Sequence, residues 1–365
     1  MKLPILNGIN PHVVPVNQLH PSVGSPIRVL SGLPGYINVL DALNSWRLVK
    51  ELRKHTGLPS VSAFKHLNPT GTAVGYPLDE RMEQMYETST IAQSLLACAF
   101  LRSRSMDREV NQEDFIAFSD PLDFHTAKLL LEEDPKGIIA PAYEPRALDL
   151  LKAHKESSFL IVEMDSSFEP EPPDKQTIFG LTIEPELPAL SSESYSDSFL
   201  HLNVPQDINP GKKVDLLISL ITLKYSHSHS VALVYNGQTI GLGAGQQSIG
   251  ISFKMAMEKA KNWMMLQHPR VLSMSIPMHM NKSQRELLKS DYIQRKFTSE
   301  DCYSWMKAFQ GVCMASDRPL NPHSQLQEAS RLGVRYHIPS LTLTPAKSSY
   351  SDFCEELGIL CLPNM

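Results

Sequence analysis

Short apolar stretches alternate with helix-like stretches along most of this sequence. Residues 115–118 and 137–140 are typical: each stretch is too short for a helix and carries no charge, as expected of a strand covered on both faces. Strands are predicted over residues 58–64, 115–118, 137–140, 158–164, 179–182, 231–235, 239–243, 271–276, 312–315, 335–338 and 359–362. Helices are predicted over residues 35–54, 79–104, 123–133, 146–155, 215–225, 252–266, 300–309, 324–332 and 350–357. This alternation predicts an α/β fold with mixed sheets and helices on their faces.

The alternation is interrupted once, by a stretch rich in Pro, Glu and Ser over residues 166–210. Proline lacks a backbone N–H, so this stretch suits neither a helix nor a central strand. A chain of 365 residues is about two domains long. We therefore expect a first domain over residues 1–180 and a second over residues 181–365. The similar order of strands and helices in the two parts is consistent with a duplicated α/β module.

Composition excludes several classes of partner. The net charge is −5 and the sequence contains no long basic run, which argues against a nucleic-acid partner. No apolar run reaches the roughly 18 residues of a membrane span, and the N-terminus has no signal-peptide core. The five Cys are scattered without metal-ligand spacing, which indicates reduced thiols and no metal site. These features predict a cytoplasmic protein without a nucleic-acid or membrane partner.

Polar residues follow several predicted strands. Lys65 and His66 follow one of them, Ser119 and Asp120 a second, and Asp165 a third. Because strand ends collect around one crevice in open α/β sheets, we expect these side chains to lie close together. The segment after His66 is rich in Gly, Pro and Asn and is expected to turn into the helix over residues 79–104.

Lys65 and His66 form the pair best suited to chemistry. A lysine can stabilise a developing negative charge, and histidine has the unperturbed pKa nearest neutrality. From the pair alone, a catalytic site and a solvated loop are both open readings.

The segment from Lys65 to Gly75 resembles the Lys-His-Val-Asn-Pro-x-Gly-Ala-Ala-Val-Gly signature of AICAR transformylases, the formyl-transferring half of a bifunctional purine-biosynthesis enzyme. Further blocks match in the family's order, at residues 8–12, 33–44, 119–120, 137–141, 224–226, 243–248 and 268–269. The resemblance implies two tandem cytidine-deaminase-like domains. It also implies a homodimer whose sites lie at the subunit interface. The cyclohydrolase domain that usually precedes this half is not expected in the chain.

The resemblance also implies roles for individual residues. In the family, the Lys-His pair serves transfer of a formyl group from 10-formyltetrahydrofolate to a weakly basic aromatic amine. His66 would then be the general base and Lys65 the group that stabilises the oxyanion. His229 stands where the family has an Asn and would face His66 as a further catalytic group. The same comparison assigns substrate-binding roles to Asn7, Asn10, Asn68, Ala142, Asp165, Gln246, Gln247 and Ser324, and it assigns no metal ligand.

Several positions depart from the family pattern. Leu6 and Asn7 replace an Arg-Tyr pair, Ala142 replaces a Gly, Ile249 replaces an Arg, and Ser324 replaces an Asp. The family's final Arg also has no counterpart. The missing cations would have held the phosphate of the family's substrate, and a buried dianion without paired cations is strongly disfavoured. These changes predict an unphosphorylated substrate, an aromatic amine of the kind found in secondary metabolism.

Three hypotheses for function remain open. The first is N-formyl transfer from 10-formyltetrahydrofolate to such an amine. The second is a folate-independent cyclisation, condensation or hydrolysis by the same Lys-His pair, with His229 as a second acid or base. The third is a non-catalytic pseudoenzyme kept for dimerisation or binding, against which the presence of both Lys65 and His66 argues. An AICAR transformylase with substituted ligands is a further alternative.

Overall fold

The computed structural model describes residues 25–88, 94–106, 113–154, 159–169, 205, 207–277, 279–339 and 347–362. It also describes the short antiparallel pairs β1 (Leu3–Pro4) with β2 (Gln18–Leu19) and β9 (Gln176–Ile178) with β10 (Leu181–Ile183). The strand predicted over residues 179–182 overlaps β10, and its first two residues lie outside the described part. No helix in the described ranges is long and apolar enough to span a bilayer.

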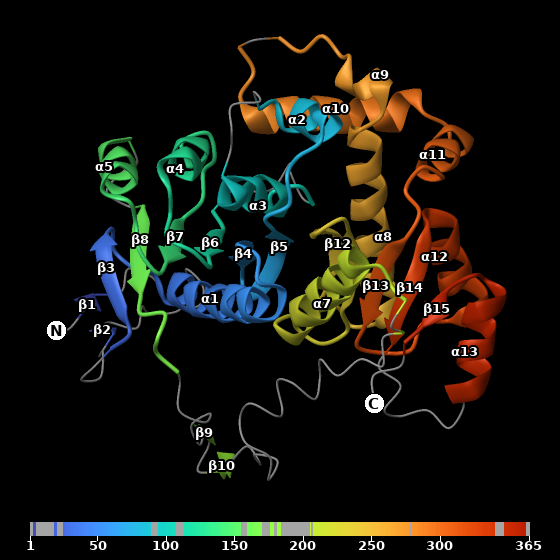
Figure 1. Cartoon of the computed structure of the whole chain (residues 1–365), viewed down its shortest axis with the longest axis horizontal. Helices are drawn as coiled ribbons and strands as arrows, with labels where there is room; N and C mark the ends of the chain where they lie inside the picture. The colour runs from blue at the N-terminus through green and yellow to red at the C-terminus, as the bar shows by residue number, and fades with distance from the viewer. Residues whose placement is uncertain are drawn as a thin grey trace.

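An 11-stranded mixed sheet forms the centre of the molecule, in the order β15-β14-β13-β11-β12-β5-β4-β6-β7-β8-β3 (Figure 1). Its strands are β3 (Ile27–Ser31), β4 (Ser60–Lys65), β5 (Asn68–Val74), β6 (Phe115–Phe118), β7 (Gly137–Ala140), β8 (Leu160–Met164), β11 (Val231–Tyr235), β12 (Gln238–Gly243), β13 (Val312–Ser316), β14 (Val334–Pro339) and β15 (Leu360–Cys361). The predicted α/β class is therefore confirmed. Strands from both predicted domains share this one sheet.

The same strand order occurs on both sides of the sheet's middle. β4 and β5 form an antiparallel hairpin, β4 pairs antiparallel with β6, and β6, β7 and β8 follow in parallel. β11 and β12 form a second hairpin, β11 pairs antiparallel with β13, and β13, β14 and β15 follow in parallel. The two sets meet where β5 pairs with β12, at Ala73 and Gln238. The two hairpins therefore lie side by side in the centre of the sheet.

Helices cover both faces of the sheet (Figure 1). They are α1 (Tyr36–Thr56), α2 (Glu80–Tyr86), α3 (Leu95–Ser103), α4 (Phe124–Leu130), α5 (Pro145–His154), α7 (Pro210–Lys224), α8 (Ile249–Leu266), α9 (Pro269–Leu272), α10 (Lys282–Lys296), α11 (Ser299–Met306), the π-helical turn η1 (Pro322–Leu326), α12 (Gln327–Leu332) and α13 (Lys347–Glu356). Alternate residues of a strand point to opposite faces, so each strand contributes to two cores. Phe64 packs in the core under α1 and α7, and Val61 and Ala63 pack in the core under α3 and α8.

Two predictions around the first hairpin are wrong. The Gly/Pro/Asn-rich segment after His66 is strand β5 and not a turn into a helix. A Cβ at Gly71 would lie 1.8 Å from the Ser103 carbonyl oxygen, so glycine allows this strand to pack against α3. The single helix predicted over residues 79–104 is two helices, α2 and α3. Glu87, at φ 54°, adopts the left-handed conformation that ends α2.

Two further differences lie in the C-terminal half. The strand predicted over residues 271–276 is instead the short helix α9 followed by irregular chain. His268 caps this helix and Pro269 occupies its first position, where proline's missing N–H costs nothing. Helix α10 was not predicted. Its sequence is rich in charge and has few buried residues, so apolar periodicity does not reveal it.

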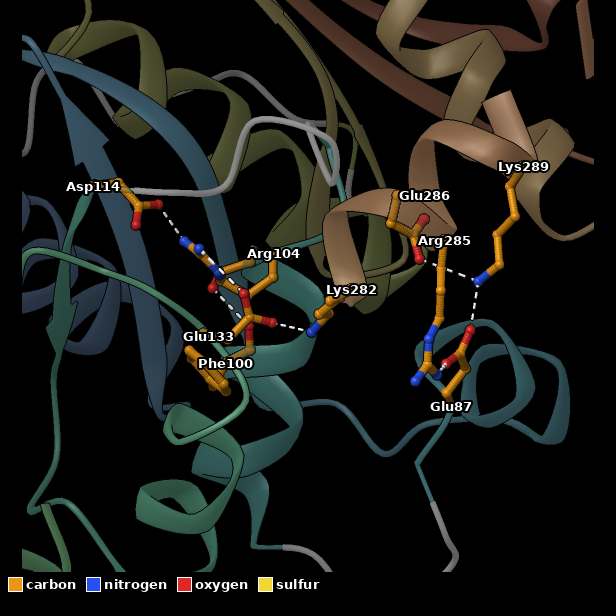
Figure 2. Close-up of polar contacts among 10 residues, drawn as sticks. Glu87, Phe100, Arg104, Asp114, Glu133, Lys282, Arg285, Glu286 and Lys289 are labelled. Atoms are coloured by element: carbon orange, nitrogen blue, oxygen red, sulfur yellow. Dashed lines mark hydrogen bonds and ion pairs between the residues drawn. The ribbon is translucent and has the colours of Figure 1, made fainter. Parts of the chain in front are cut away.

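Ion pairs join α10 to the first half of the chain (Figure 2). Lys282 bonds Glu133, and Arg285 and Lys289 bond the carboxylate of Glu87 at 2.6 and 2.7 Å. On the inner side, the buried guanidinium of Arg104 lies between Asp114 and Glu133. A chain of alternating charges therefore connects α10 to α2 and to the end of α3.

A buried histidine gives the fold a predictable dependence on pH. His337 on β14 is fully buried, and its Nε2 lies 3.1 Å from the Tyr350 hydroxyl. Burial lowers the pKa of His337 to about 4. The folded state thus keeps this ring neutral, while in the unfolded chain it takes up a proton near pH 6.5. Its contribution to stability is complete above pH 6.5 and is lost as the pH falls towards 4.

The wild type is therefore expected to lose about 2 kcal/mol more than His337→Gln between pH 7.5 and pH 5. Urea unfolding of both proteins at the two pH values measures this difference, and the substitution's own cost cancels because only the change with pH is compared. An equal loss in both proteins would show that His337 does not carry the effect.

Candidate functional site

Lys65 and His66 lie at the tip of the β4–β5 hairpin. Lys65 pairs with Asn68, so His66 and Leu67 form a two-residue turn. Their φ angles are 52° and 64°, the positive values found at both positions of type I′ turns. Each residue with a side chain in this left-handed conformation costs about 1–2 kcal/mol. The surroundings must therefore hold the turn that presents His66.

A carboxylate beneath the turn supplies part of that support. Asp41 on the buried side of α1 is only 3% exposed, and its Oδ1 accepts the Leu67 N–H at 2.7 Å. Burial raises the pKa of Asp41, while the Leu67 N–H and the nearby charge of His66 oppose that rise. The structure thus keeps an acidic group close to His66 despite the cost of burying it.

Asn68 joins the tip of the first hairpin to the segment before β11. Its Nδ2 lies 2.8 Å from Nδ1 of His227, and its Oδ1 accepts the His227 N–H at 2.9 Å. Because an amide nitrogen can only donate, His227 Nδ1 is the acceptor, and the proton of the neutral ring lies on Nε2. The backbone N–H of Gly245 donates to the His227 carbonyl, which adds the loop after β12 to the same cluster.

His229 lies on the same segment and has a defined tautomer. Its Nδ1 is 3.1 Å from the Gln246 carbonyl oxygen, which can only accept, so Nδ1 carries the proton. In the neutral ring, Nε2 then keeps its lone pair. His229 is half-buried, and its φ of 58° is again left-handed. This arrangement suits an acid–base group.

Three further predicted residues at the same end of the central strands lie on the loop after β12 and on η1. The Gln246 Nε2 donates to the Ala244 carbonyl at 3.3 Å, and Gln247 is exposed. Ser324 is exposed on η1, where its N–H and hydroxyl both donate to Asn321. A Cβ at Gly250 would lie 3.4 Å from the side chain of Gln325, so η1 packs against the start of α8 just after this loop.

Ala142 and Asp165 do not join this cluster within one chain. β4 runs antiparallel to β6, so the end of β6 meets the start of β4, where the Ser119 N–H donates to the Ser60 carbonyl at 3.0 Å. β7 and β8 run parallel to β6, and Ala142 and Asp165 follow their ends. The length of β4, about 17 Å, therefore separates them from Lys65. The expectation of one crevice for all strand ends is wrong within the subunit.

Asp165 has a local role in its own loop. Ser167 donates two hydrogen bonds to Oδ1 of Asp165, from its backbone N–H at 2.9 Å and from its hydroxyl at 2.7 Å. These bonds lower the pKa of Asp165. Lys50 is the cation that acts on it electrostatically, and its ammonium already bonds Glu169 and the Phe168 carbonyl. Asn7 and Asn10 lie outside the described residues.

Arg104 is a buried cation close to the end of β4 that carries Lys65 and His66. Asp114 directly precedes Phe115, which pairs with Phe64, so Asp114 is next to Lys65 across the strands. Figure 2 shows the Arg104 guanidinium between Asp114 and Glu133. Two carboxylates neutralise this cation, so it does not supply a free positive charge for a phosphate.

Sequence reasoning missed two residues of the cluster. Asp41 and His227 are not among the site residues predicted from the sequence. The signal for Asp41 was its spacing from Ser45, Leu48 and Leu52, which places the carboxylate on the buried side of α1. Among the residues with described positions, no three or more His, Cys, Asp or Glu side chains gather to hold a metal ion.

This geometry defines an α/β protein with a Lys-His pair on a strained hairpin at the centre of its sheet. The model of the AICARFT/IMPCHase bienzyme family matches residues 7–259, from before β3 into α8. The chain therefore belongs to this family, an enzyme family, and the predicted resemblance is confirmed. The match includes both hairpins and ends before β13.

Curated relatives agree with the family match. The chain is 30% identical over 225 residues to the bifunctional purine biosynthesis protein PurH of Chlorobium phaeobacteroides (strain BS1). The matched region covers 62% of this chain and 38% of the relative. It is 27% identical over 225 residues to the protein of that name from Bacillus subtilis (strain 168), with coverage of 62% and 39%. The chain thus spans about two fifths of the length of these relatives.

Proposed function

We propose that this protein transfers a formyl group from 10-formyltetrahydrofolate to a weakly basic, unphosphorylated aromatic amine. The observation that carries the proposal is the display of Lys65 and His66 on the left-handed tip of β4–β5 in a chain of this family. His66 is exposed there, so a ligand can reach its imidazole. The half-buried Lys65 is its direct neighbour in the chain.

The two side chains have complementary tasks in this reaction. The amine nitrogen must lose a proton as it bonds to the formyl carbon, and the His66 imidazole accepts that proton. The carbonyl oxygen becomes an oxyanion at the same time, and the Lys65 ammonium stabilises its charge. His66 can then return the proton to the leaving nitrogen. His229, with a lone pair on Nε2, supplies a second proton acceptor at the same end of the central strands.

The residues at this end of the central strands suit uncharged polar groups, such as those of a pterin ring and an amine, better than a phosphate. Gln246, Gln247 and Ser324 are uncharged, and together with Asn68 they offer both donors and acceptors. We assign these residues to 10-formyltetrahydrofolate and the amine, with Asn7 and Asn10 as further binding positions. The donor would supply the activated formyl group, and the chain's own residues orient it.

We further propose tandem cytidine-deaminase-like domains over residues 1–180 and 181–365. The repeated strand order supports this division. So does a repeated detail: Asp41 is the sixth residue of α1 and Asp215 the sixth residue of α7. Each carboxylate accepts at least one backbone N–H from the turn of the hairpin that follows its helix.

A homodimer with sites at the subunit interface is part of the proposal. Ala142 and Asp165 lie at the far end of the sheet from Lys65 within one chain, so they serve the same site only if a second subunit brings its copies to it. The proposed partners are therefore a second copy of the chain and a small-molecule amine, with no nucleic acid or membrane.

Substrate choice can be tested with a matched pair of amines. AICAR and its dephosphorylated nucleoside differ only in the phosphate, so we expect faster formylation of the nucleoside, with kcat/KM higher by about tenfold or more, because charge pairing for the phosphate is missing. Calorimetry with a folate analogue tests the donor separately and is expected to show binding. Preference for AICAR would contradict the unphosphorylated substrate, and absent folate binding would contradict the formyl donor.

The His229 tautomer favours one alternative, folate-independent acid–base chemistry between His66 and His229. Turnover of an aromatic amine or amino compound without any folate would favour this second function over formyl transfer. A protein that binds ligands at this edge but loses nothing in His66→Ala would be a pseudoenzyme.

A further inference from the structure

The two hairpins at the centre of the sheet have turns of the same geometry but different sequence. The first turn, at residues 65–68, reads Lys-His-Leu-Asn, and the second, at residues 235–238, reads Tyr-Asn-Gly-Gln. In both, the outer residues pair across the hairpin and the inner two have positive φ. The φ values are 52° and 64° in the first turn and 50° and 84° in the second.

The second turn has the sequence that this geometry prefers, and the first has not. Asn and Gly adopt the left-handed conformation readily, and Asn-Gly is the strongest two-residue hairpin signal. His and Leu adopt it reluctantly. The residues at the inner positions of the first turn therefore oppose the conformation in which the structure holds them, as is common at functional sites.

The carboxylates of Asp41 and Asp215, which hold the two turns, differ in their charged partners. Asp215 accepts from Asn236 at 3.1 Å and from Gly237 at 2.7 Å, and its charge is paired with Lys212 at 2.9 Å. Asp41 accepts from Leu67 at 2.7 Å, and the charged group of the turn that acts on it is His66 itself. The second carboxylate thus supports a turn that forms readily, while the first supports one that does not.

We propose that Asp41 is the positioning residue of the Lys-His site. Its carboxylate holds the Leu67 N–H, which keeps residues 66 and 67 left-handed and presents the His66 imidazole beside the segment of His227 and His229. Asp41 does not touch the substrate and acts through the turn. The effect of Asp41 on catalysis rests on the proposed formyl transfer. The effect of Asp41 on the turn can be tested without any substrate.

Hydrogen–deuterium exchange of the full-length protein tests the turn directly. Asp41→Ala is expected to speed exchange in peptides that span residues 64–70 by about tenfold, because the Leu67 N–H loses its acceptor. Asp215→Ala is the matched control and is expected to affect only peptides around residues 234–239. Asp41→Ala with Leu67→Gly should restore protection of the neighbouring amides at the first tip, since glycine adopts positive φ without strain, while the N–H of residue 67 stays without its acceptor. Unchanged exchange in Asp41→Ala would overturn the proposal.

Kinetics test the link to catalysis. Asp41→Ala is expected to lower kcat for formyl transfer by about tenfold or more with little change in KM, because a displaced base slows the chemical step more than binding. The added Leu67→Gly should recover most of that loss, and Asp215→Ala should keep the wild-type kcat. An equal loss of kcat in Asp41→Ala and Asp215→Ala would overturn a specific role for Asp41. If the wild type transfers no formyl group, the proposed function fails, and exchange alone decides whether Asp41 holds the turn.

Discussion

Replacement of His66 by Ala is expected to lower kcat for formyl transfer by about 10²- to 10⁴-fold, the usual effect of removing a general base. The side chain is exposed at a hairpin tip, so the melting temperature should hardly change. Lys65→Ala is expected to cost about 10²- to 10³-fold, as the loss of one oxyanion-stabilising group does elsewhere. Steady-state kinetics and thermal unfolding of each variant give both quantities.

His125→Ala is the matched control for His66→Ala. His125 is also exposed but lies on α4, away from the β4–β5 tip, so its removal should leave kcat and KM unchanged. A His66→Ala protein with wild-type kcat would contradict the general-base role. A large fall in melting temperature would instead assign His66 to the fold.

Arg104→Met is expected to destabilise the protein by about 3–5 kcal/mol. The Arg104 guanidinium is fully enclosed and bonds the buried carboxylates of Asp114 and Glu133 (Figure 2). Its removal leaves Asp114 buried without the Arg104 cation, while Glu133 keeps its ion pair with Lys282. The free energy of unfolding in urea at pH 7 measures the effect.

Arg28→Met is the control for the buried network. Arg28 bonds Glu163 at 2.6 Å, but its side chain is 69% exposed, and exposed ion pairs contribute about 0–1 kcal/mol. A similar small loss in Arg104→Met would contradict the account of a buried network that anchors the end of α3.

The elements with local signals could be predicted from the sequence. Strands β6 and β7 are short, uncharged and apolar, and Asn236-Gly237 marks the second hairpin by its own turn chemistry. The first hairpin has no such signal. Its His66-Leu67 turn depends on a carboxylate 26 residues earlier in the chain, at Asp41, and local sequence does not reveal such a contact.

Long-range electrostatics and strand direction explain the other differences. Helix α10 is held by Glu87 and Glu133, which lie far away in the sequence. The separation of Asp165 from Lys65 follows from the antiparallel pairing of β4 with β6. Alternation of strands and helices predicts an α/β sheet but does not fix the direction of each strand. The sequence therefore predicted that all these polar residues lie at the same end of the sheet, although β6, β7 and β8 end opposite to β4.

The most direct test of the Lys65-His66 site is to follow an isotopically labelled formyl group from 10-formyltetrahydrofolate into an unphosphorylated aromatic amine. We predict that the wild type forms the labelled N-formyl product and that the double variant Lys65→Ala/His66→Ala forms none above the uncatalysed rate. Equal labelling by the wild type and the double variant would contradict the account, because the transfer would then occur without the pair on the β4–β5 turn.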